Sequence, residues 1–336
     1  MSDIVCLLPG DGIGPEVTTA AREVVDASGA DIEWVNLPAG VTALEFCGSV
    51  LPERTTAAIE GHGVALKGPL TTPIGTGHSS VNVQLRKRLN LFAAVRPVRS
   101  MPGIKTRFDN VDLVIIRENT EGLYSGIENE VAEGVVTSLK VATSKACRRI
   151  ARFAFDYAVS RGRKKVTVFH KANIMKMSDG LFLTCARKEY EPFADKIAYE
   201  ELIIDNGCMQ LVRDPSKFDV LLLENLYGDI ISDLAAGLVG GLGVVPGANI
   251  GRTCAVFEAV HGSAPDIARK GIANPLACIM SAVMMLNHMG KTEQAARIRT
   301  AYDVVLSIGR PEDLTPDVGG KGTTQSFTRA VIKAMQ

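Results

Sequence analysis

The sequence predicts an α/β protein of two domains. Short runs of aliphatic and β-branched residues alternate with longer amphipathic segments along the whole chain, which is typical of strands and helices that follow one another in α/β folds. The length of 336 residues corresponds to about two domains. Hydrophobic residues make up 46% of the chain and charged residues 22%, a balance typical of globular proteins with a large core.

Each predicted element follows from its local pattern. Strands are expected at the short aliphatic runs, residues 4–8, 32–36, 64–67, 91–96, 111–117, 166–170, 220–224 and 253–257. Helices are expected over the amphipathic segments 15–28, 144–160, 229–238, 275–288, 291–307 and 324–335. Pro15 suits a first helical turn, where no N–H is needed, and Ser144 can cap its helix. Residues 127–141 lack a helical period and predict a β-hairpin.

Charge and cysteine content exclude several classes of protein. Lys plus Arg and Asp plus Glu are equal at 37 each, so no overall field favours nucleic acid or a membrane surface. The seven cysteines are scattered without a Cys-x-x-Cys pair, which fits reduced thiols better than disulfides or a zinc site. The weakly polar stretch 234–247 is too short to span a bilayer, and the N-terminus has no targeting pattern. We expect a cytoplasmic location without nucleic-acid or membrane partners.

The first strand and helix are joined by Leu-Pro-Gly-Asp-Gly-Ile-Gly-Pro-Glu, residues 8–16. Glycines at such a turn let the backbone approach a ligand and direct N–H groups toward it. The spacing differs from the Gly-x-Gly-x-x-Gly fingerprint, so a standard Rossmann domain is not predicted. A tight turn without a ligand is an equally simple interpretation. No phosphate-binding loop of the Walker type occurs, which disfavours nucleotide hydrolysis.

Polar side chains are expected where a ligand would bind. Arg96 and Arg117 end two predicted strands, and Ser80, Asn82 and Arg86 begin a possible helix. Open α/β sheets bind ligands at the carboxyl ends of their strands, and guanidinium groups bind carboxylates through paired hydrogen bonds. The arginines predict a polycarboxylate site, although each one alone is equally consistent with a solvated surface residue.

Acidic residues predict a metal site. Asp229 and Asp233 are four residues apart, so on a helix they share one face and repel each other unless a cation neutralises them. Carboxylates favour Mg²⁺ or Mn²⁺ over zinc, and the apolar neighbours of the pair argue against an open acidic surface. Asp205, after another strand-like run, is a third candidate. Tyr124 and Lys171 also follow strand ends and can transfer protons if their pKa values are lowered, although a lone Tyr or Lys is more often structural.

Residues 257–267 predict a further strand, loop and helix. Asp266 can accept hydrogen bonds from a ribose 2′-hydroxyl and would repel a 2′-phosphate. The alternative is an ordinary acid in the first turn of a helix, where the helix dipole favours it.

These motifs together resemble the isocitrate/isopropylmalate dehydrogenase family of β-decarboxylating dehydrogenases over nearly the whole chain. The matching segments are residues 10–16, 67–96, 117–124, 170–176, 225–233 and 258–275. The resemblance implies an isopropylmalate dehydrogenase-like two-domain α/β fold that differs from the standard Rossmann domain. It implies a large domain of residues 1–96 plus 239–336, a small domain of residues 97–238, and a homodimer with shared active sites.

The resemblance also implies roles for individual residues. Substrate-carboxylate contacts are implied for Ser80, Asn82, Arg86, Arg96 and Arg117. Metal ligands are implied for Asp229 and Asp233, with Asp205 supplied by the other copy in the dimer. Tyr124 and the partner's Lys171, assisted by Asp229, are implied for proton transfer. The cofactor surface is implied to comprise Thr72, Asn82, Glu258, His261, Gly262, Asp266, Ile267, Ala273 and Asn274.

Two short motifs favour one substrate and one cofactor. Ser80-Val81-Asn82 resembles isocitrate dehydrogenases, and Asp266-Ile267 resembles NAD users. The expected reaction is therefore oxidative decarboxylation of isocitrate to 2-oxoglutarate with NAD⁺ and Mg²⁺ or Mn²⁺. The alternatives are homoisocitrate, tartrate or 3-isopropylmalate as substrate, and a non-catalytic regulatory subunit of NAD-isocitrate dehydrogenase. Ala172 departs from the Gly of some isocitrate enzymes, and the sequence gives no role to Glu224.

Overall fold

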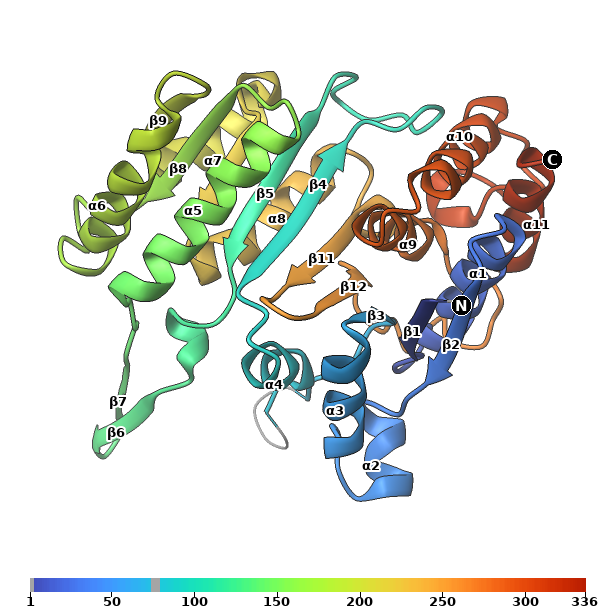
Figure 1. Cartoon of the computed structure of the whole chain (residues 1–336), viewed down its shortest axis with the longest axis horizontal. Coiled ribbons are helices and arrows are strands. Elements are labelled where there is room, and N and C mark those ends of the chain that lie inside the picture. The colour runs from blue at the N-terminus through green and yellow to red at the C-terminus, as the bar shows by residue number, and fades with distance from the viewer. Residues whose placement is uncertain (1–2, 74–78) are drawn as a thin grey trace. The chain divides into compact units, whose positions relative to one another are not determined.

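A computed structural model describes residues 3–73 and 79–336 of the chain (Figure 1). The α/β expectation is confirmed, and contacts divide the chain into two compact units. The first unit comprises the described residues of Met1–Leu91, Ser100–Asp109 and Val239–Gln336, and the second comprises Phe92–Arg99 and Asn110–Leu238.

The first unit contains a mostly parallel set of strands. Its order is β2 (Ile32–Asn36), β1 (Asp3–Leu8), β3 (Val64–Lys67), β12 (Ala255–Ala259) and β11 (Pro246–Ile250). All neighbours are parallel except β12 and β11, which are antiparallel. The register pairs Leu8 with Lys67 and Lys67 with Glu258, so the ends of β1, β3 and β12 lie together at one edge.

The helices of the first unit surround these strands. They are α1 (Gly14–Ala27), α2 (Val41–Cys47), α3 (Glu53–His62), α4 (Val81–Arg88), α9 (Leu276–His288), α10 (Thr292–Ile308) and α11 (Thr324–Ala334), with short 3-10 turns at Leu242–Val244 and Pro316–Val318. Helix α9 is buried on nearly every side because β11, β12, α1 and α10 all contact it. Each large apolar side chain buried in such a core contributes about 1.5–3 kcal/mol.

Neighbouring backbone accounts for two of the glycines of residues 8–16. Gly10 and Gly12 have φ angles of 78° and 59°. A Cβ atom on Gly10 would lie 2.2 Å from the carbonyl oxygen of Pro69, and one on Gly12 would lie 1.9 Å from that of Ser263. The glycines therefore serve a tight turn that two other loops approach closely.

The second unit contains the strands β4 (Ala93–Arg99), β5 (Asp112–Glu118), β10 (Val220–Leu223), β8 (Lys165–His170) and β9 (Ala198–Ile203), in that order. Strand β4 is antiparallel to β5, and the others run parallel to β5. The helices are α5 (Ser144–Ser160), α6 (Ser178–Tyr190), α7 (Ile204–Arg213) and α8 (Asn225–Leu238), with 3-10 turns at Leu123–Ser125, Glu191–Phe193 and Pro215–Lys217. The carboxyl ends of β5, β8 and β10 consequently lie at one edge, where β5 carries Arg117 and where Lys171 and α8 follow β8 and β10.

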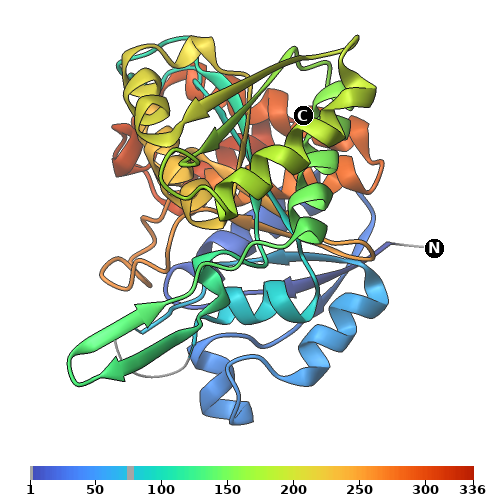
Figure 2. The same ribbon diagram turned by 90° about the vertical axis from the view of Figure 1, so that its left-hand side faces the viewer.

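The predicted hairpin is present as an exposed arm of the second unit. Strands β6 (Glu128–Ala132) and β7 (Val135–Ser138) are antiparallel, and every residue of both strands is exposed. Figure 2 shows the arm extending beyond the helices of its own unit.

Several boundaries differ from the sequence prediction. Thr143, not Ser144, caps α5, because its hydroxyl accepts the N–H of Ala146 at 3.2 Å. Helix α8 begins four residues before the predicted start at Asp229. Helices α2, α3, α6 and α7 and strands β9 and β11 were not predicted.

The unit boundary also differs from the expected domain boundary in two places. Residues 92–96 lie in the second unit because β4 pairs with β5 along its whole length. Residues 100–109 lie in the first unit, where the backbone of Gly103 is so close to Leu306 that a Cβ atom would lie 2.0 Å from the Leu306 oxygen. Among the described residues, no helix is long and apolar enough to cross a membrane.

Candidate active site

Three predicted site residues of the second unit converge on Asp229. Arg117, buried on β5, donates a hydrogen bond from Nη1 to Oδ1 of Asp229. Tyr124 donates from its hydroxyl to Oδ2 of the same carboxylate at 2.5 Å, and Nη1 of Arg96 lies 3.8 Å from Oδ1. The guanidinium of Arg117 also lies 5.0 Å from the centre of the Tyr124 ring. Two cations and a phenol therefore surround one carboxylate. Arg117 lies at the carboxyl end of β5, where the sequence predicted a ligand site, whereas Arg96 lies in the middle of β4 and not at a strand end as predicted.

The first turn of α8 places Asp229 in this cluster. The carboxylate of Glu224 accepts the N–H groups of Leu226 and Tyr227, at 3.3 and 2.9 Å, and so caps the helix. The side chain of Arg117 lies against Gly228, where a Cβ atom would come within 2.5 Å of the Arg117 Cγ. Glu224, to which the sequence gave no role, thus fixes the start of α8, the helix that carries the two predicted metal ligands.

Asn225 is a further residue that sequence reasoning missed. Its Oδ1 accepts hydrogen bonds from Nε and Nη2 of Arg117 at 3.1 and 2.7 Å, and its Nδ2 donates to the carbonyl oxygen of Glu121 at 3.0 Å. These contacts hold the Arg117 guanidinium in one orientation. In the sequence, only the position of Asn225 near Asp229 could have indicated this role.

Asp229 and Asp233 lie one helical turn apart on α8, as predicted. The pKa of Asp233 is raised, because neighbouring atoms exclude part of its water and Asp229 adds negative charge, against the opposing effect of Arg96 and Arg117. The expectation that apolar neighbours shield this face was wrong for a single chain, because Ile230 is 54% exposed and Asp233 is also exposed. Two carboxylates on one open face fit a hard divalent cation, provided that further ligands come from elsewhere.

Asp205 does not join these two acids within one chain. It opens α7 and lies 2.6 Å, Oδ1 to Nζ, from Lys171, which follows β8. This hydrogen bond lowers the pKa of Asp205. In the described part of the chain, no group of three His, Cys, Asp or Glu residues is arranged to hold a metal ion. Among the described residues, Asp205 therefore lies with Lys171 and not with Asp229 and Asp233.

The first unit holds the other predicted substrate residues. Ser80 caps α4, accepting the N–H of Val83 at 3.4 Å, and Thr72 donates to the Ser80 hydroxyl at 3.3 Å. Within the described residues, Asn82 Oδ1 and Arg86 Nε are buried without a hydrogen-bond partner. Buried polar atoms without partners are rare in folded proteins, so this part of α4 has the character of a ligand-binding surface.

Glu258 lies between buried cations. Its carboxylate lies 2.5 Å from Nζ of Lys67 and 3.4 Å from Nη2 of Arg86, and it accepts a hydrogen bond from Asn249 at 2.6 Å. Burial alone would raise the pKa of Glu258, but the two neighbouring cations outweigh burial and lower it. Glu258 therefore orients Arg86, a contact that the sequence did not predict.

Residues 260–275, where the cofactor residues were expected, form a loop. The helix predicted around Asp266 is absent, because Ala264 and Arg269 have left-handed φ angles of 39° and 64° and interrupt any helical turn. Asp266 is therefore an exposed loop acid and not a first-turn acid. Its neighbour Ile267 is half-buried and Gly262 is exposed.

The two ends of this loop differ in how they are held. Nε2 of His261 is buried without a partner among the described residues, and burial lowers the pKa of this histidine. Ala273 donates its N–H to Glu16 at 3.1 Å, and Asn274 donates to Asp317 at 2.8 Å. The loop carrying Asp266 is thus tied down at its C-terminal end.

Comparison with known proteins identifies the family. A model of the isocitrate/isopropylmalate dehydrogenase family matches residues 4–333. Residues 74–78 of the predicted motif 67–96 lie outside the residues that the structure describes. The chain is 52% identical to isocitrate dehydrogenase (NAD) catalytic subunit 5, mitochondrial, of Arabidopsis thaliana, over 97% of this chain and 86% of that one. It is 50% identical to a mitochondrial regulatory subunit of isocitrate dehydrogenase (NAD) from Dictyostelium discoideum, over 98% and 91% of the two chains.

A solved structure gives the same result. The crystal structure of isocitrate dehydrogenase from Methylococcus capsulatus superposes with a TM-score of 0.96 at 48% identity, covering 100% of this chain and 99% of that one. The chain belongs to the isocitrate/isopropylmalate dehydrogenase family.

Proposed function

We propose that this chain catalyses the oxidative decarboxylation of isocitrate to 2-oxoglutarate with NAD⁺ and Mg²⁺ or Mn²⁺. The observation that carries the proposal is the convergence of Arg96, Arg117 and Tyr124 on Asp229, next to Asp233 on the same helix face. This arrangement provides cations for carboxylates, carboxylates for a metal and a phenol for proton transfer. The relatives at about half identity, named as NAD-dependent isocitrate dehydrogenase subunits, support the same assignment.

The proposal gives the polar residues of each unit a task in binding. Arg96 and Arg117 bind substrate carboxylates through paired hydrogen bonds. Ser80, Asn82 and Arg86 bind the remaining carboxylate, and Arg86 does so through its buried Nε–H, which has no partner in the described chain. Recognition through several arginines favours a tricarboxylic hydroxy-acid over substrates with an alkyl group.

Asp229 and Asp233 hold the metal together with the partner's Asp205. When bound, a divalent cation acidifies the substrate hydroxyl and stabilises the negative charge left by decarboxylation. Asp229 accepts hydrogen bonds from Arg117 and Tyr124, and these two groups would have to release its oxygens for Asp229 to hold a metal ion.

The partner's Lys171, assisted by Asp229, accepts the proton of the C2 hydroxyl while C2 loses a hydride to NAD⁺. The bond between C3 and its carboxylate then breaks, and CO₂ leaves. Tyr124 donates a proton to C3, which completes 2-oxoglutarate. The products are 2-oxoglutarate, CO₂ and NADH, so atoms and electrons balance.

We propose NAD⁺ as the cofactor because Asp266 is an exposed acid on the loop after β12. A carboxylate there can accept hydrogen bonds from the ribose 2′-hydroxyl. If this carboxylate were in contact with a 2′-phosphate, the repulsion between the two negative charges would cost on the order of kilocalories per mole. The residues at the ends of the loop, His261, Ala273 and Asn274, complete the proposed cofactor surface.

We propose a homodimer because apolar side chains are exposed beside the second unit's site. Met209 and Val212 on α7 and Ile230 on α8 are 45%, 42% and 54% exposed, and Val131 and Val136 of the hairpin are also exposed. Covering these surfaces with a second copy would supply Asp205 and Lys171 to the site of its neighbour. The cytoplasmic location expected from the sequence stays a prediction.

A substrate and cofactor panel tests the proposed function. The purified chain, assayed alone with Mg²⁺, is expected to have its highest kcat/KM with isocitrate and NAD⁺. Homoisocitrate, tartrate and 3-isopropylmalate should be poorer substrates, and NADP⁺ a poorer cofactor. A preference for another acid or for NADP⁺ would overturn that part of the assignment. A chain inactive alone, and active only beside a different chain of the same family, would favour the regulatory alternative that the Dictyostelium relative's name suggests.

A further inference from the structure

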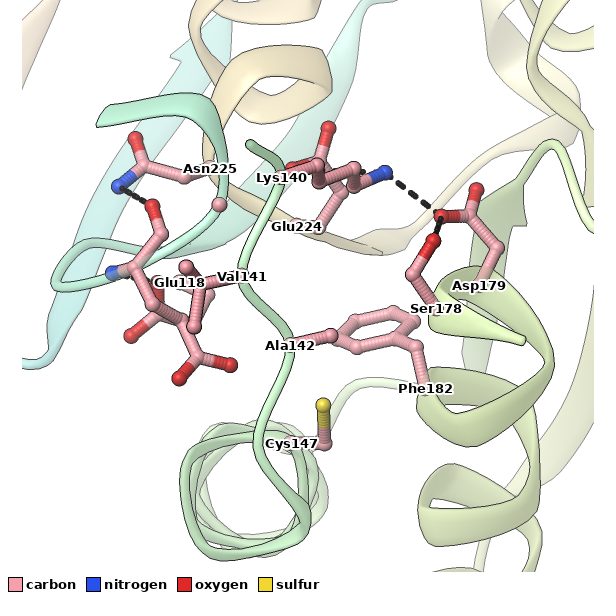
Figure 3. Close-up of a pocket in the computed structure, with 12 residues that line it drawn as sticks. Glu118, Lys140, Val141, Ala142, Cys147, Ser178, Asp179, Phe182, Glu224 and Asn225 are labelled. Carbon is pink, nitrogen blue, oxygen red and sulfur yellow. Dashed lines mark hydrogen bonds and ion pairs between the residues drawn. The ribbon is translucent and has the colours of Figure 1, made fainter. Parts of the chain in front are cut away.

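Asp179 is a buried carboxylate that none of the proposed steps uses. It lies in the first turn of α6 and is 2% exposed. Its Oδ2 accepts the backbone N–H of Lys171 at 2.7 Å, and its Oδ1 accepts a hydrogen bond from Nζ of Lys140 at 2.6 Å. Figure 3 shows Lys140 reaching Asp179 from the segment that follows the hairpin arm. Both oxygens of this carboxylate are therefore committed to separate donors.

The contact with Lys171 fixes the backbone of a proposed catalytic residue. The carbonyl oxygen of Lys171 accepts the N–H groups of Ile174 and Met175 at 3.0 and 2.8 Å. Its amide N–H is held by Asp179. Because both polar backbone groups are engaged, the Cα–Cβ direction of Lys171 depends on the Asp179 carboxylate, while its ammonium group remains accessible beside the exposed Asp205.

Lys140 provides the positive charge that pairs with the buried Asp179 carboxylate. Its ammonium group lies 3.9 Å from Glu224, and 4.6 Å from the centre of the Tyr227 ring. The group faces a small cavity of about 20 Å³, lined also by Glu118, Glu121 and Phe182. The cavity is large enough for about one water molecule, so an isolated carboxylate here would be poorly solvated without the lysine.

We propose that Asp179 is a positioning residue, which sets the direction of the Lys171 side chain for proton transfer in the partner's active site. The inference rests on the proposed function, in which the partner's Lys171 completes each site. Two hydrogen bonds to one buried carboxylate are directional and charge-assisted, and displacing a catalytic group by about 1 Å can cost on the order of 100-fold in rate.

A second route for the effect of Asp179 must be separated from this one. Lys140 also approaches Glu224, and Glu224 caps α8, which carries Asp229. Through that route, loss of Asp179 would disturb the metal motif of its own chain. The two routes predict damage in different active sites of the dimer, so they can be distinguished.

Replacement of Asp179 by Asn is the appropriate first variant. Asparagine has the same shape but only one acceptor oxygen, so it cannot serve both the Lys171 N–H and the Lys140 ammonium group. We expect D179N to lower kcat about 10- to 100-fold with a much smaller change in KM for isocitrate. The matched control is D156N on α5, whose partner Arg152 is exposed, and it should keep the wild-type kcat. Wild-type kcat in D179N would overturn the inference.

Mixed dimers, isolated with two different affinity tags, locate the damage. A D179N chain paired with a D229N chain should regain one working site, because the intact Asp229 of the first chain meets the intact Lys171 of the second. A D179N chain paired with a K171M chain should regain none. Recovery only with K171M would assign Asp179 to α8 of its own chain, and recovery with neither would assign it to folding. Either result would overturn the inference.

The mixed dimer of K171M with D229N separates failure of this inference from failure of the proposed function. It contains one complete site if active sites are shared, so it should recover activity that neither parent dimer has. If this mixed dimer recovers no activity while the wild type is active, the proposal of shared active sites is wrong, and so is the role of Asp179 that depends on it. If it recovers activity and D179N behaves as wild type, only the role of Asp179 is wrong.

Discussion

Tyr124 and Lys171 have different hydrogen-bond partners, which matches the different half-reactions proposed for them. Tyr124 donates to Asp229, whereas Lys171 lies 2.6 Å from Asp205. A positioned acid or base contributes about 100- to 10,000-fold to a rate. We expect Y124F and K171M each to lose at least about 100-fold in kcat.

A partial reaction should separate the two residues. Exchange of the C3 hydrogen of 2-oxoglutarate with solvent deuterium, in the presence of Mg²⁺ and NADH, requires the proton donor but not hydroxyl deprotonation. Y124F should lose this exchange and K171M should retain most of it. Equal exchange in the two variants would remove the separate roles.

Glu258 holds two buried cations, so its charge should matter for stability in a pH-dependent way. Its pKa is lowered in the folded protein, so its stabilising effect is complete above the pKa of the unfolded chain, near ~4.3. The effect then declines as the pH falls toward the folded pKa. E258Q leaves Lys67 and Arg86 without their shared counter-charge. Loss of one partner of a buried ion pair typically lowers the free energy of unfolding by about 3–5 kcal/mol.

Thermal unfolding from neutral pH down to about pH 3 measures this effect. The Tm of E258Q should lie well below that of the wild type at neutral pH, and the difference should shrink below about pH 4. A difference that grows on acidification would contradict the assigned ion pair.

At the scale of the element, α8 must lie directly on the side chain of Arg117. A Cβ atom at Gly228 would come 2.5 Å from the Arg117 Cγ, whereas one at Gly237 on the same helix would meet nothing within 4 Å. We expect G228A to displace Arg117 and to lower kcat/KM for isocitrate about 100-fold. G237A, the matched control, should keep full activity and gain up to about 1 kcal/mol of stability. Equal activity of the two variants would show that the contact is not needed.

The strand ends could be predicted from sequence because each buried strand has a local signature. Aliphatic runs located Arg117 and Lys171, and the spacing of Asp229 and Asp233 placed them on one helix face. The true start of α8 was not predictable, because Glu224 caps it from within the predicted strand. The loop at Asp266 was missed because left-handed φ angles at Ala264 and Arg269, which are not glycines, leave no pattern.

At the scale of the whole molecule, contacts between distant segments escaped the sequence. Lys140, Asp179 and Glu224 come from three separate segments of the second unit, and no sequence pattern predicts that they lie together. The same holds for Lys67 and Glu258, which only the register of β3 and β12 brings together. Sequence therefore located the residues proposed for chemistry, while the residues that orient them became visible only in three dimensions.

Within one chain the three predicted metal ligands lie in two places, because Asp229 and Asp233 are on α8 whereas Asp205 lies beside Lys171. The central claim is that these acids of two copies hold one metal ion while arginines hold the substrate. The most direct measurement is NADH formation from isocitrate by metal-stripped protein during titration with Mg²⁺, with D233N in parallel. The wild type should be inactive until Mg²⁺ is added, and D233N should need far more Mg²⁺ to reach half of its maximal rate. Undiminished turnover by the stripped protein, or the same Mg²⁺ requirement in D233N, would contradict the claim.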